Sequence, residues 1–327
     1  MIARARKLFD SSYLAPTITV SLFALIFGIG SVSYTGFFST QVFLNLFIDN
    51  AFLLVIAIGM TFVILSGGID LSVGSVVALT TMVSAYLVQV LHWNPVLVVV
   101  CVLLIGLTLG AGMGALIHFF NLQPFIVTLA GMFFARGLCY LISINSMTIT
   151  DPLYTTFAQT RIEIFGAFVS PSVIIAIGML AIAVYLAHYT RFGRTVYAIG
   201  GNEHSALLMG LPVGRTKIMV YAFSGFCAAL GGVLFSFYML SGYGLHALGT
   251  ELDAIAAVVI GGTLLTGGFG YVIGTMFGVL ILGVIQTLIT FDGTLSSWWT
   301  KIVIGILLLV FCVAQRLLAI GAEANKR

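Results

Sequence analysis

Residues 45–79 read NLFIDNAFLLVIAIGMTFVILSGGIDLSVGSVVAL, and this stretch decides the class of the protein. Its first part is an apolar run with the length that an α-helix needs to cross about 30 Å of hydrocarbon, which is about 20 residues. A short segment with a pair of glycines and an aspartate follows, and a second apolar run begins at Leu71. The pattern predicts two consecutive membrane-spanning helices.

The composition extends this prediction to the whole chain. Of its 327 residues, 61% are hydrophobic and only 7% are charged. A soluble domain has a charged fraction of about 25%, so a soluble globular protein is excluded. We predict an all-α polytopic membrane protein. Its four cysteines stand singly inside apolar runs, and its five histidines are scattered, so we expect neither a metal site nor a bound cofactor.

Apolar runs of spanning length predict about ten transmembrane helices. We place them near residues 14–34, 42–65, 71–91, 96–118, 124–145, 171–189, 218–241, 252–268, 271–291 and 298–316. Proline and polar residues at 92–95 and 121–124 indicate hairpin ends. The runs that meet at Gly67-Gly68 and at Gly267-Gly268 can alternatively be broken helices.

The basic residues predict the orientation. With ten spans and both termini in the cytoplasm, the inner side receives most of the lysines and arginines, as the positive-inside rule requires. These are Arg4, Arg6, Lys7, Arg191, Arg194, Arg215, Lys217, Arg316, Lys326 and Arg327. The loop at 190–217 is then cytoplasmic.

That loop contains a complete signal for one short helix. Asn202 can cap a helix from Glu203 to Met209, and Gly210 with Pro212 can end it. Two turns are too short to be stable alone in water. Because Leu207, Leu208 and Met209 are apolar residues in a polar loop, we expect them to contact a partner protein.

Two glycine-rich stretches indicate an internal repeat. LSGGIDLSVGS at 65–75 and LTGGFGYVIGT at 265–275 match at a constant offset of 200 residues. Transporters often contain such repeats, with interrupted helices that line the path. In the predicted topology both stretches lie on the cytoplasmic side, which makes the repeat parallel; an inverted repeat would need one span to be misplaced. A chance match between glycine-rich sequences is the alternative.

Other features of the spans have two interpretations each. The many glycines either allow close helix packing or expose backbone carbonyls along a substrate path. Asp70 either caps the following helix or belongs to the path. Arg136 is expected to pair with an acid such as Asp49. No span carries the several acids or histidines of a proton relay, and the chain has no phosphate-binding loop of the Gly-x-x-x-x-Gly-Lys-Ser/Thr type.

Several ordered motifs carry a family resemblance. Residues 45–79, together with QPFIVTL at 123–129, AIGGNE at 198–203 and ELDAIAAVVIGG at 251–262, resemble the permease subunits of carbohydrate-type ABC importers. The likeness covers most of the chain. Within the ribose, xylose and galactofuranose group, it is greatest to the galactofuranose permeases.

The resemblance implies a single transmembrane permease domain over residues 1–327, in the bacterial cytoplasmic membrane. It implies three partners: a cytoplasmic ATP-binding subunit, an extracytoplasmic sugar-binding protein and a second permease, which is a homologous sister. The chain itself is then not an enzyme. In this family the loop corresponding to 190–217 couples the permease to the ATPase. The implied coupling residues are Gly200, Gly201, Asn202, Glu203, His204, Ser205, Ala206, Leu207, Leu208, Met209 and Gly210.

At one place the chain departs from the family pattern. Relatives usually continue after Gly-Asn-Glu with two alanines and an arginine, whereas this chain has Ser205 to Met209. The contact face is therefore more apolar, which puts in doubt the usual ion pair with the ATPase.

We expect the substrate path near the glycine pairs and neighbouring polar residues. The expected residues are Asn50, Ser66, Gly67, Gly68, Asp70, Gln123, Phe125, Gly261, Gly262, Gly267 and Gly268. The predicted cargo is a monosaccharide, with galactofuranose favoured. A nucleoside or a branched amino acid is the alternative cargo, and an ion-coupled secondary sugar transporter is the alternative machinery. The scarcity of ionisable residues in the spans argues against the latter.

Overall fold

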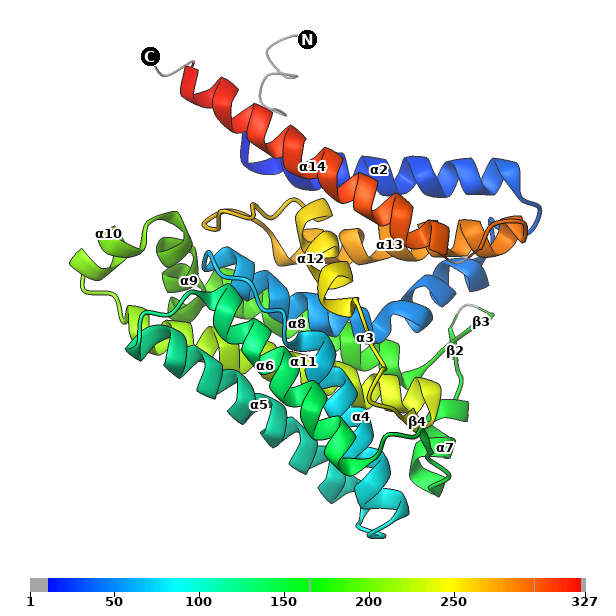
Figure 1. Ribbon diagram of the computed structural model, residues 1–327. Helices are drawn as coiled ribbons and strands as arrows, with labels where there is room; N and C mark the ends of the chain where they lie inside the picture. The colour runs from blue at the N-terminus through cyan, green and yellow to red at the C-terminus, as the bar shows by residue number, and fades with distance from the viewer. Residues whose placement is uncertain (1–10, 165, 297, 325–327) are drawn as a thin grey trace.

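The computed structural model describes residues 11–164, 166–296 and 298–324, and within them the chain is mainly helical. The long helices form one bundle, with α2 and α14 lying along one side of it beside α13 (Figure 1). The helices are α2 (Ser11–Ser33), α3 (Thr40–Leu65), α4 (Val73–Gln89), α5 (Pro95–Phe119), α6 (Pro124–Ile142), α7 (Pro152–Gln159), α8 (Pro171–Tyr189), α9 (Arg191–Gly201), α10 (Glu203–Leu208), α11 (Val213–Met239), α12 (Thr250–Ile260), α13 (Val272–Asp292) and α14 (Trp298–Ala324).

A helix occupies each of the ten predicted span positions, but not all of these helices are long enough to cross a membrane. Among the described residues, α3, α5, α6, α8, α11 and α13 have sufficient length and apolar character. Helices α4 and α12 have only 17 and 11 residues, whereas α2 and α14 have 23 and 27. Ten complete spans are therefore not confirmed.

The predicted span at 252–268 is wrong in its second half. Helix α12 has 11 residues, so at a rise of about 1.5 Å per residue it covers about half of the hydrocarbon thickness. It ends at Gly261, and the next helix begins only at Val272. The intervening backbone has positive φ at Gly262, Gly267 and Gly268, which no helix accommodates. The alternative of a broken helix at the Gly267-Gly268 pair is the correct one.

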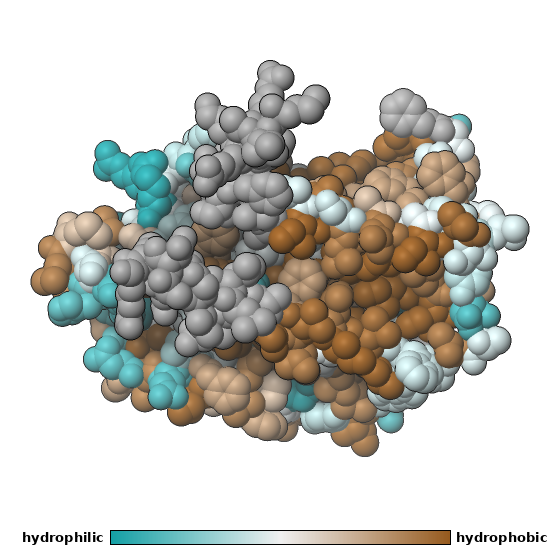
Figure 2. Space-filling model, turned by 90° about the horizontal axis from the view of Figure 1, so that it is seen from above, coloured by the Kyte–Doolittle hydropathy of each residue, from teal (hydrophilic) through white to brown (hydrophobic). Residues whose placement is uncertain are grey.

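The surface agrees with a membrane location. Figure 2 shows a broad band of apolar side chains across the middle of one face, with hydrophilic residues gathered toward its two ends. Large exposed apolar residues are numerous on α5, α6 and α14. A soluble protein would not leave so much apolar area in water.

The predicted hairpin ends are confirmed. Asn94 caps α5, because its side chain accepts a hydrogen bond of 2.9 Å from the backbone N–H of Val96. Pro95 and Pro124 occupy the first turns of α5 and α6, where the missing N–H costs nothing.

Close packing explains the glycines of α5. Gly106, Gly110 and Gly114 face α11, and a Cβ on Gly110 would overlap the backbone of Tyr221. Gly112 is different, since nothing lies within 4 Å of a Cβ placed there. For α5, close helix packing is therefore the correct interpretation of the glycine pattern.

This difference predicts opposite effects of two matched substitutions. Gly110→Ala should destabilise the protein by about 1–3 kcal/mol because the α5–α11 contact must open. Gly112→Ala should leave stability unchanged or raise it by about 0.5–1 kcal/mol, since alanine favours the helix. Thermal unfolding of both variants in the same detergent measures the difference. Equal melting temperatures would show that the α5–α11 contact is not tight.

Short elements gather at the two ends of the bundle. Helices α9 and α10 lie at one end, which we call the α10 end. At the opposite end, the strand end, lie α7 and two antiparallel strand pairs (Figure 1). β1 (Met147–Thr148) pairs with β4 (Ser241–Gly242), and β2 (Ile162–Ile164) pairs with β3 (Ala167–Val169).

Candidate functional site

The predicted short helix is present as α10. It runs from Glu203 to Leu208, one residue shorter than expected. The side chain of Asn202 accepts a hydrogen bond of 2.8 Å from the N–H of Ser205, and Gly210 has φ +74° just after the helix. Both predicted helix signals are therefore confirmed.

The segment before α10 is not the polar loop that the sequence suggested. Residues 191–201 form the helix α9, which buries Val196 and Ile199. Phe192, Val196 and Ile199 have the i, i+4, i+7 spacing of a helix face, so the signal was present. The three glycines and two arginines of the same segment are typical of a polar loop, and for that reason the helix was not predicted.

Helix α10 presents an exposed apolar tip. Leu207, Leu208 and Met209 are 58%, 73% and 68% exposed. Ala206, by contrast, is fully buried against Ile199 and Val213. The helix is thus held on the protein by one small residue while its large apolar side chains face outward.

An ion pair fixes the position of α10 on the bundle. The Lys217 ammonium lies 2.7 Å from the Glu203 carboxylate, although Glu203 is half exposed. Exposed pairs of this kind contribute little stability, about 0–1 kcal/mol. The ion pair at the first residue of α10 and the buried Ala206 in its middle together hold the helix against the bundle.

Three glycine pairs meet directly beside α9. We call Gly67, Gly68, Gly200, Gly201, Gly267 and Gly268 the glycine junction. A Cβ on Gly267 would lie 2.7 Å from the backbone nitrogen of Gly67, and a Cβ on Gly268 would lie 2.7 Å from that of Gly201. A Cβ on Gly200 would overlap the carbonyl oxygen of Leu65 and the nitrogen of Gly268. At Gly200, Gly267 and Gly268, only a residue without a side chain allows the backbones to lie this close.

Hydrogen bonds tie the junction together. The N–H of Gly268 donates to the Leu65 carbonyl over 2.9 Å, which joins the two predicted repeat stretches. The Tyr197 hydroxyl of α9 donates to the Gly270 carbonyl over 2.7 Å. Burial raises the pKa of Tyr197 to about 12, so its hydroxyl keeps the proton it donates at neutral pH. Helix α9 is therefore fastened to the 261–271 segment.

The two repeat stretches have related local structure. Gly67 and Gly267 have φ values of +81° and +82°, and a helix begins at Val73 in one case and at Val272 in the other. The preceding elements differ, because α3 continues to Leu65 whereas α12 ends at Ile260. Both stretches lie at the α10 end, in contact with each other.

Asp70 makes structural hydrogen bonds just before α4, although the N-cap residue of that helix is Ser72 rather than Asp70. It is fully buried, and it accepts hydrogen bonds from the Ser72 N–H at 2.9 Å, from the Ser72 hydroxyl at 2.6 Å and from the Ser224 hydroxyl at 2.8 Å. These bonds satisfy the carboxylate and join the start of α4 to α11.

The other residues expected along the path are spread over the molecule. The Ser66 hydroxyl donates to the Val63 carbonyl within its own turn. Gln123 is exposed at the start of α6, and Phe125 is 50% exposed. Gly261 packs on Gly274 at the α12–α13 contact. The chain adopts a positive φ at Gly262.

Asn50 lies apart from the rest, toward the strand end. It borders a cavity of 360 Å³ that is also lined by Gln286, Asp253 and Lys301. The Lys301 ammonium lies 2.5 Å from the Asp253 carboxylate. The expected path residues therefore do not surround one common cavity.

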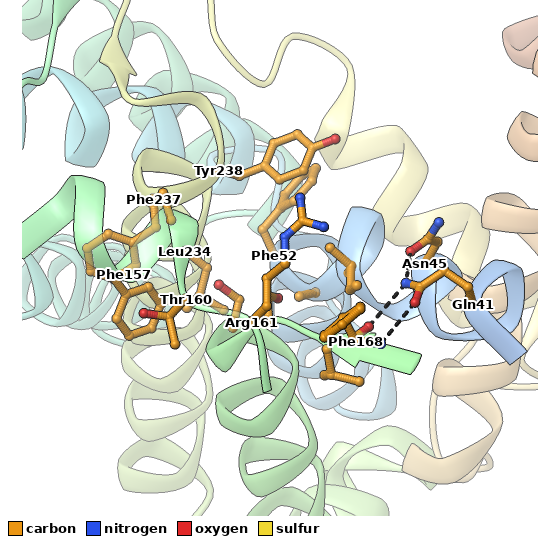
Figure 3. Close-up of a pocket in the computed structure, with 16 residues that line it drawn as sticks. Gln41, Asn45, Phe52, Phe157, Thr160, Arg161, Phe168, Leu234, Phe237 and Tyr238 are labelled. Atoms are coloured by element: carbon orange, nitrogen blue, oxygen red, sulfur yellow. Dashed lines mark hydrogen bonds between the residues drawn. The ribbon is translucent and has the colours of Figure 1, made fainter. Parts of the chain in front are cut away.

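A larger cavity, of 670 Å³, lies at the strand end. We call it the hairpin cavity. Figure 3 shows aromatic side chains from α3, α7, β3 and α11 around it, with the Arg161 guanidinium reaching into the space between Tyr238 and Asn45. Its labelled lining residues are Gln41, Asn45, Phe52, Phe157, Thr160, Arg161, Phe168, Leu234, Phe237 and Tyr238.

A polar network forms one wall of the hairpin cavity. The Gln41 amide donates to the Asn45 side-chain oxygen at 2.7 Å and to the Phe168 carbonyl at 3.1 Å, and it accepts from the Phe168 N–H at 2.9 Å (Figure 3). Sequence reasoning missed this cavity, because its walls come from distant segments. The lone Arg161 in a phenylalanine-rich stretch was the one available signal.

The expected pairing of Arg136 with Asp49 is wrong. The Arg136 guanidinium donates to the backbone carbonyls of Gly244 and His246, at 2.5 and 2.9 Å. Asp49 instead accepts a hydrogen bond from the Tyr238 hydroxyl. The irregular segment 243–249 has carbonyls without helical partners, and these satisfy the guanidinium without a carboxylate.

Comparison with known proteins places these features in a family. A family model described as the permease component of branched-chain amino acid transport systems matches residues 42–312. The chain belongs to this permease family. The match contains the glycine junction, α10 and the lining residues of the hairpin cavity other than Gln41.

Individual relatives of the permease are similar over nearly their full lengths. The inner membrane ABC transporter permease protein YjfF of Escherichia coli K12 is 51% identical over 300 residues, which is 91% of each chain. The fructose import permease protein FruG of Bifidobacterium longum is 41% identical, over 94% of this chain and 93% of its own. The ribose import permease protein RbsC of Escherichia coli K12 is 36% identical, over 93% and 95%. No solved structure matches the permease.

These relatives confirm the resemblance seen in the motifs. All three are named as permeases and none as an ATP-binding protein. The chain is accordingly a membrane permease of the sugar ABC importer type and not an enzyme.

Proposed function

We propose that this permease, acting as a single domain, forms the membrane passage of an ATP-driven importer for a monosaccharide, galactofuranose in particular. The observation that carries the proposal is the exposed apolar tip of α10 directly beside the glycine junction. Its partners are a cytoplasmic ATP-binding subunit, an extracytoplasmic sugar-binding protein and a sister permease. This orientation puts α10 and both termini in the cytoplasm.

The tip of α10 is suited to a groove on the ATP-binding subunit. Each leucine side chain that becomes buried contributes about 1.5–3 kcal/mol to docking. The only acidic residue between 191 and 217 is Glu203, and Lys217 occupies it. Docking therefore relies on apolar contact rather than on an ion pair at this position.

The glycine junction can transmit movement of α10 into the bundle. Gly200 and Gly201 are the last residues of α9, and Asn202 immediately starts α10. A displacement of α10 must therefore move the backbone that touches both repeat stretches. We propose that these stretches form the inner gate, held closed by backbone contact in the present arrangement. Packed elements of this kind have discrete arrangements, so ATP-driven movement of α10 would switch between them.

The hairpin cavity is suited to receive a sugar at the outer face. Its volume falls in the range of about 300–1,000 Å³ typical of small-molecule sites. Aromatic faces can stack on the C–H surface of a sugar ring, while Gln41, Asn45 and Arg161 can bond its hydroxyls. Helix α3 borders this cavity near its start and reaches the glycine junction at its end, so it links the two ends of the path.

Filling the cavity tests this part of the proposal. Ala158 lines the cavity from α7, whereas Thr156 on the same helix is exposed and does not line it. We expect Ala158→Trp to lower sugar uptake at least about tenfold, because the indole takes the space of the sugar. Thr156→Trp should leave uptake within about twofold of the unmodified protein. The measurement is uptake of radiolabelled sugar into cells. Equal uptake by both variants would show that the hairpin cavity is not part of the sugar path.

The cargo and the energy source need separate measurements. The permease is reconstituted in proteoliposomes with its ATP-binding subunit and binding protein, and galactofuranose, ribose, a nucleoside and leucine are compared as cargo. ATP-dependent accumulation of galactofuranose above the others is the expected result. Accumulation of leucine would favour the amino acid alternative. Uptake without the ATP-binding subunit, driven by an ion gradient, would identify a secondary transporter.

A further inference from the structure

A basic groove lies beside α10 and takes no part in the proposed path. It has a volume of 730 Å³ and lies between α9 and the start of α11. Its charged residues are Arg191, Arg194 and Arg215, and its apolar lining includes Phe192, Leu211 and Met219. We call it the arginine groove.

The three arginines have no carboxylate partner among the residues that the structure describes. The ion pairs found there are Glu203 with Lys217 and Asp253 with Lys301. All three arginines are exposed, and Glu203 is the only acid in the sequence from 191 to 217. The groove therefore carries a concentrated positive charge that nothing in the described chain neutralises.

The groove lies where spanning helices leave the apolar layer. Arg191 follows two residues after α8 ends at Tyr189, and Arg215 is in the first turn of α11. Tyr185 and Tyr189, on the last two turns of α8, are 61% and 72% exposed and stack with ring centroids 6.0 Å apart. Exposed tyrosines at a helix end are typical of the membrane–water interface.

We propose that the arginine groove binds the headgroup of an anionic phospholipid. Guanidinium groups form paired hydrogen bonds with phosphate oxygens. The apolar lining can cover the glycerol backbone and the first part of an acyl chain. Basic pockets between spanning helices are known to hold such headgroups. The bound lipid would contact α9, the helix that ends with Gly200 and Gly201 of the glycine junction.

The combination of charge and apolar lining favours a lipid over a protein partner. An acidic protein surface would match the arginines but would leave the apolar lining without a contact. The exposed tip of α10 already offers a separate surface for a protein. A phospholipid satisfies both parts of the groove at once.

Lipid retention by the full-length protein tests the proposal. The protein is delipidated in detergent, exposed to vesicles of phosphatidylglycerol or phosphatidylethanolamine, and examined by native mass spectrometry. We expect phosphatidylglycerol to be retained at least tenfold more than phosphatidylethanolamine. Arg191→Gln, Arg194→Gln and Arg215→Gln combined should abolish the preference, while the three lysine substitutions should keep part of it. Arg161→Gln, which removes an exposed arginine at the strand end, should keep all of it.

Four outcomes would overturn the proposal. One is equal retention of both lipids by the unmodified protein. Another is a triple glutamine variant that keeps the preference while showing an unchanged melting temperature. The third is a triple variant that still retains phosphatidylglycerol but no longer copurifies with the ATP-binding subunit, which would assign the arginines to a protein partner. Inorganic phosphate is the remaining probe: if it raises the melting temperature as much as the lipid does, the groove is a phosphate site rather than a lipid site.

Discussion

The double variant Leu207→Asp and Leu208→Asp is expected to abolish sugar uptake. Both side chains are largely exposed in the permease alone, so their replacement should not disturb the fold. If the ATP-binding subunit buries them, losing two leucine contacts of about 1.5–3 kcal/mol each weakens docking at least about a hundredfold. The two introduced carboxylates add a desolvation cost. Uptake into cells and ATPase stimulation in proteoliposomes are the measurements.

A control at the other end of the bundle separates docking from general damage. Ile144 is 70% exposed in the turn after α6. Ile144→Asp also replaces an exposed apolar side chain with a carboxylate, one instead of two, but far from α10, and it should retain normal uptake. The double variant should also reach the membrane in normal amounts. Normal uptake by the Leu207 and Leu208 variant would show that the α10 tip is not the coupling contact.

Gly200→Ala is expected to lower uptake at least about tenfold while the protein still enters the membrane. The new methyl group would overlap the Leu65 carbonyl and the Gly268 nitrogen. Both atoms belong to backbone, which cannot move aside as a flexible side chain can, so the junction must open at a cost of about 1–3 kcal/mol. A gate that is held apart leaks or fails to close, and coupling to ATP is lost. Uptake and ATPase activity with and without sugar-binding protein measure this.

The adjacent glycine supplies the matched control. Nothing lies within 4 Å of a Cβ placed on Gly201. Gly201→Ala therefore changes helix propensity in the same turn by the same amount, without filling the junction. Its uptake should stay within about twofold of the unmodified permease. If the Gly200 and Gly201 variants behave alike, helix propensity rather than backbone contact explains the effect, and the junction is not a gate.

The two variants test different steps of the same mechanism. Loss of the Leu207 and Leu208 contacts should separate the permease from its ATP-binding subunit, so copurification falls. The Gly200 substitution should leave copurification intact, because the tip of α10 is unchanged. A variant that still binds the ATP-binding subunit but does not transport sugar would show that the defect lies in the coupling between α10 and the path.

The sequence by itself determined the features that depend on neighbouring residues. The lengths of the apolar runs predicted the helix positions, and a helix is present at each of them. This works because a helix in hydrocarbon needs only a continuous run of apolar residues. Asn202 and Gly210 placed α10 within one residue, since capping is a local interaction. The ordered motifs identified the family. At 252–268 the length of the apolar run predicted a complete span, but the helix ends at Ile260 and glycines with positive φ follow it.

Only the tertiary structure decided how these parts function together. Gly67, Gly200 and Gly267 lie far apart in the chain, and no local pattern shows that their backbones touch. The hairpin cavity likewise takes its walls from α3, α7, β3 and α11, and the arginine groove from α9 and α11. Contacts of this kind depend on how helices pack side by side, and the hydrophobic pattern along one helix does not specify its neighbour.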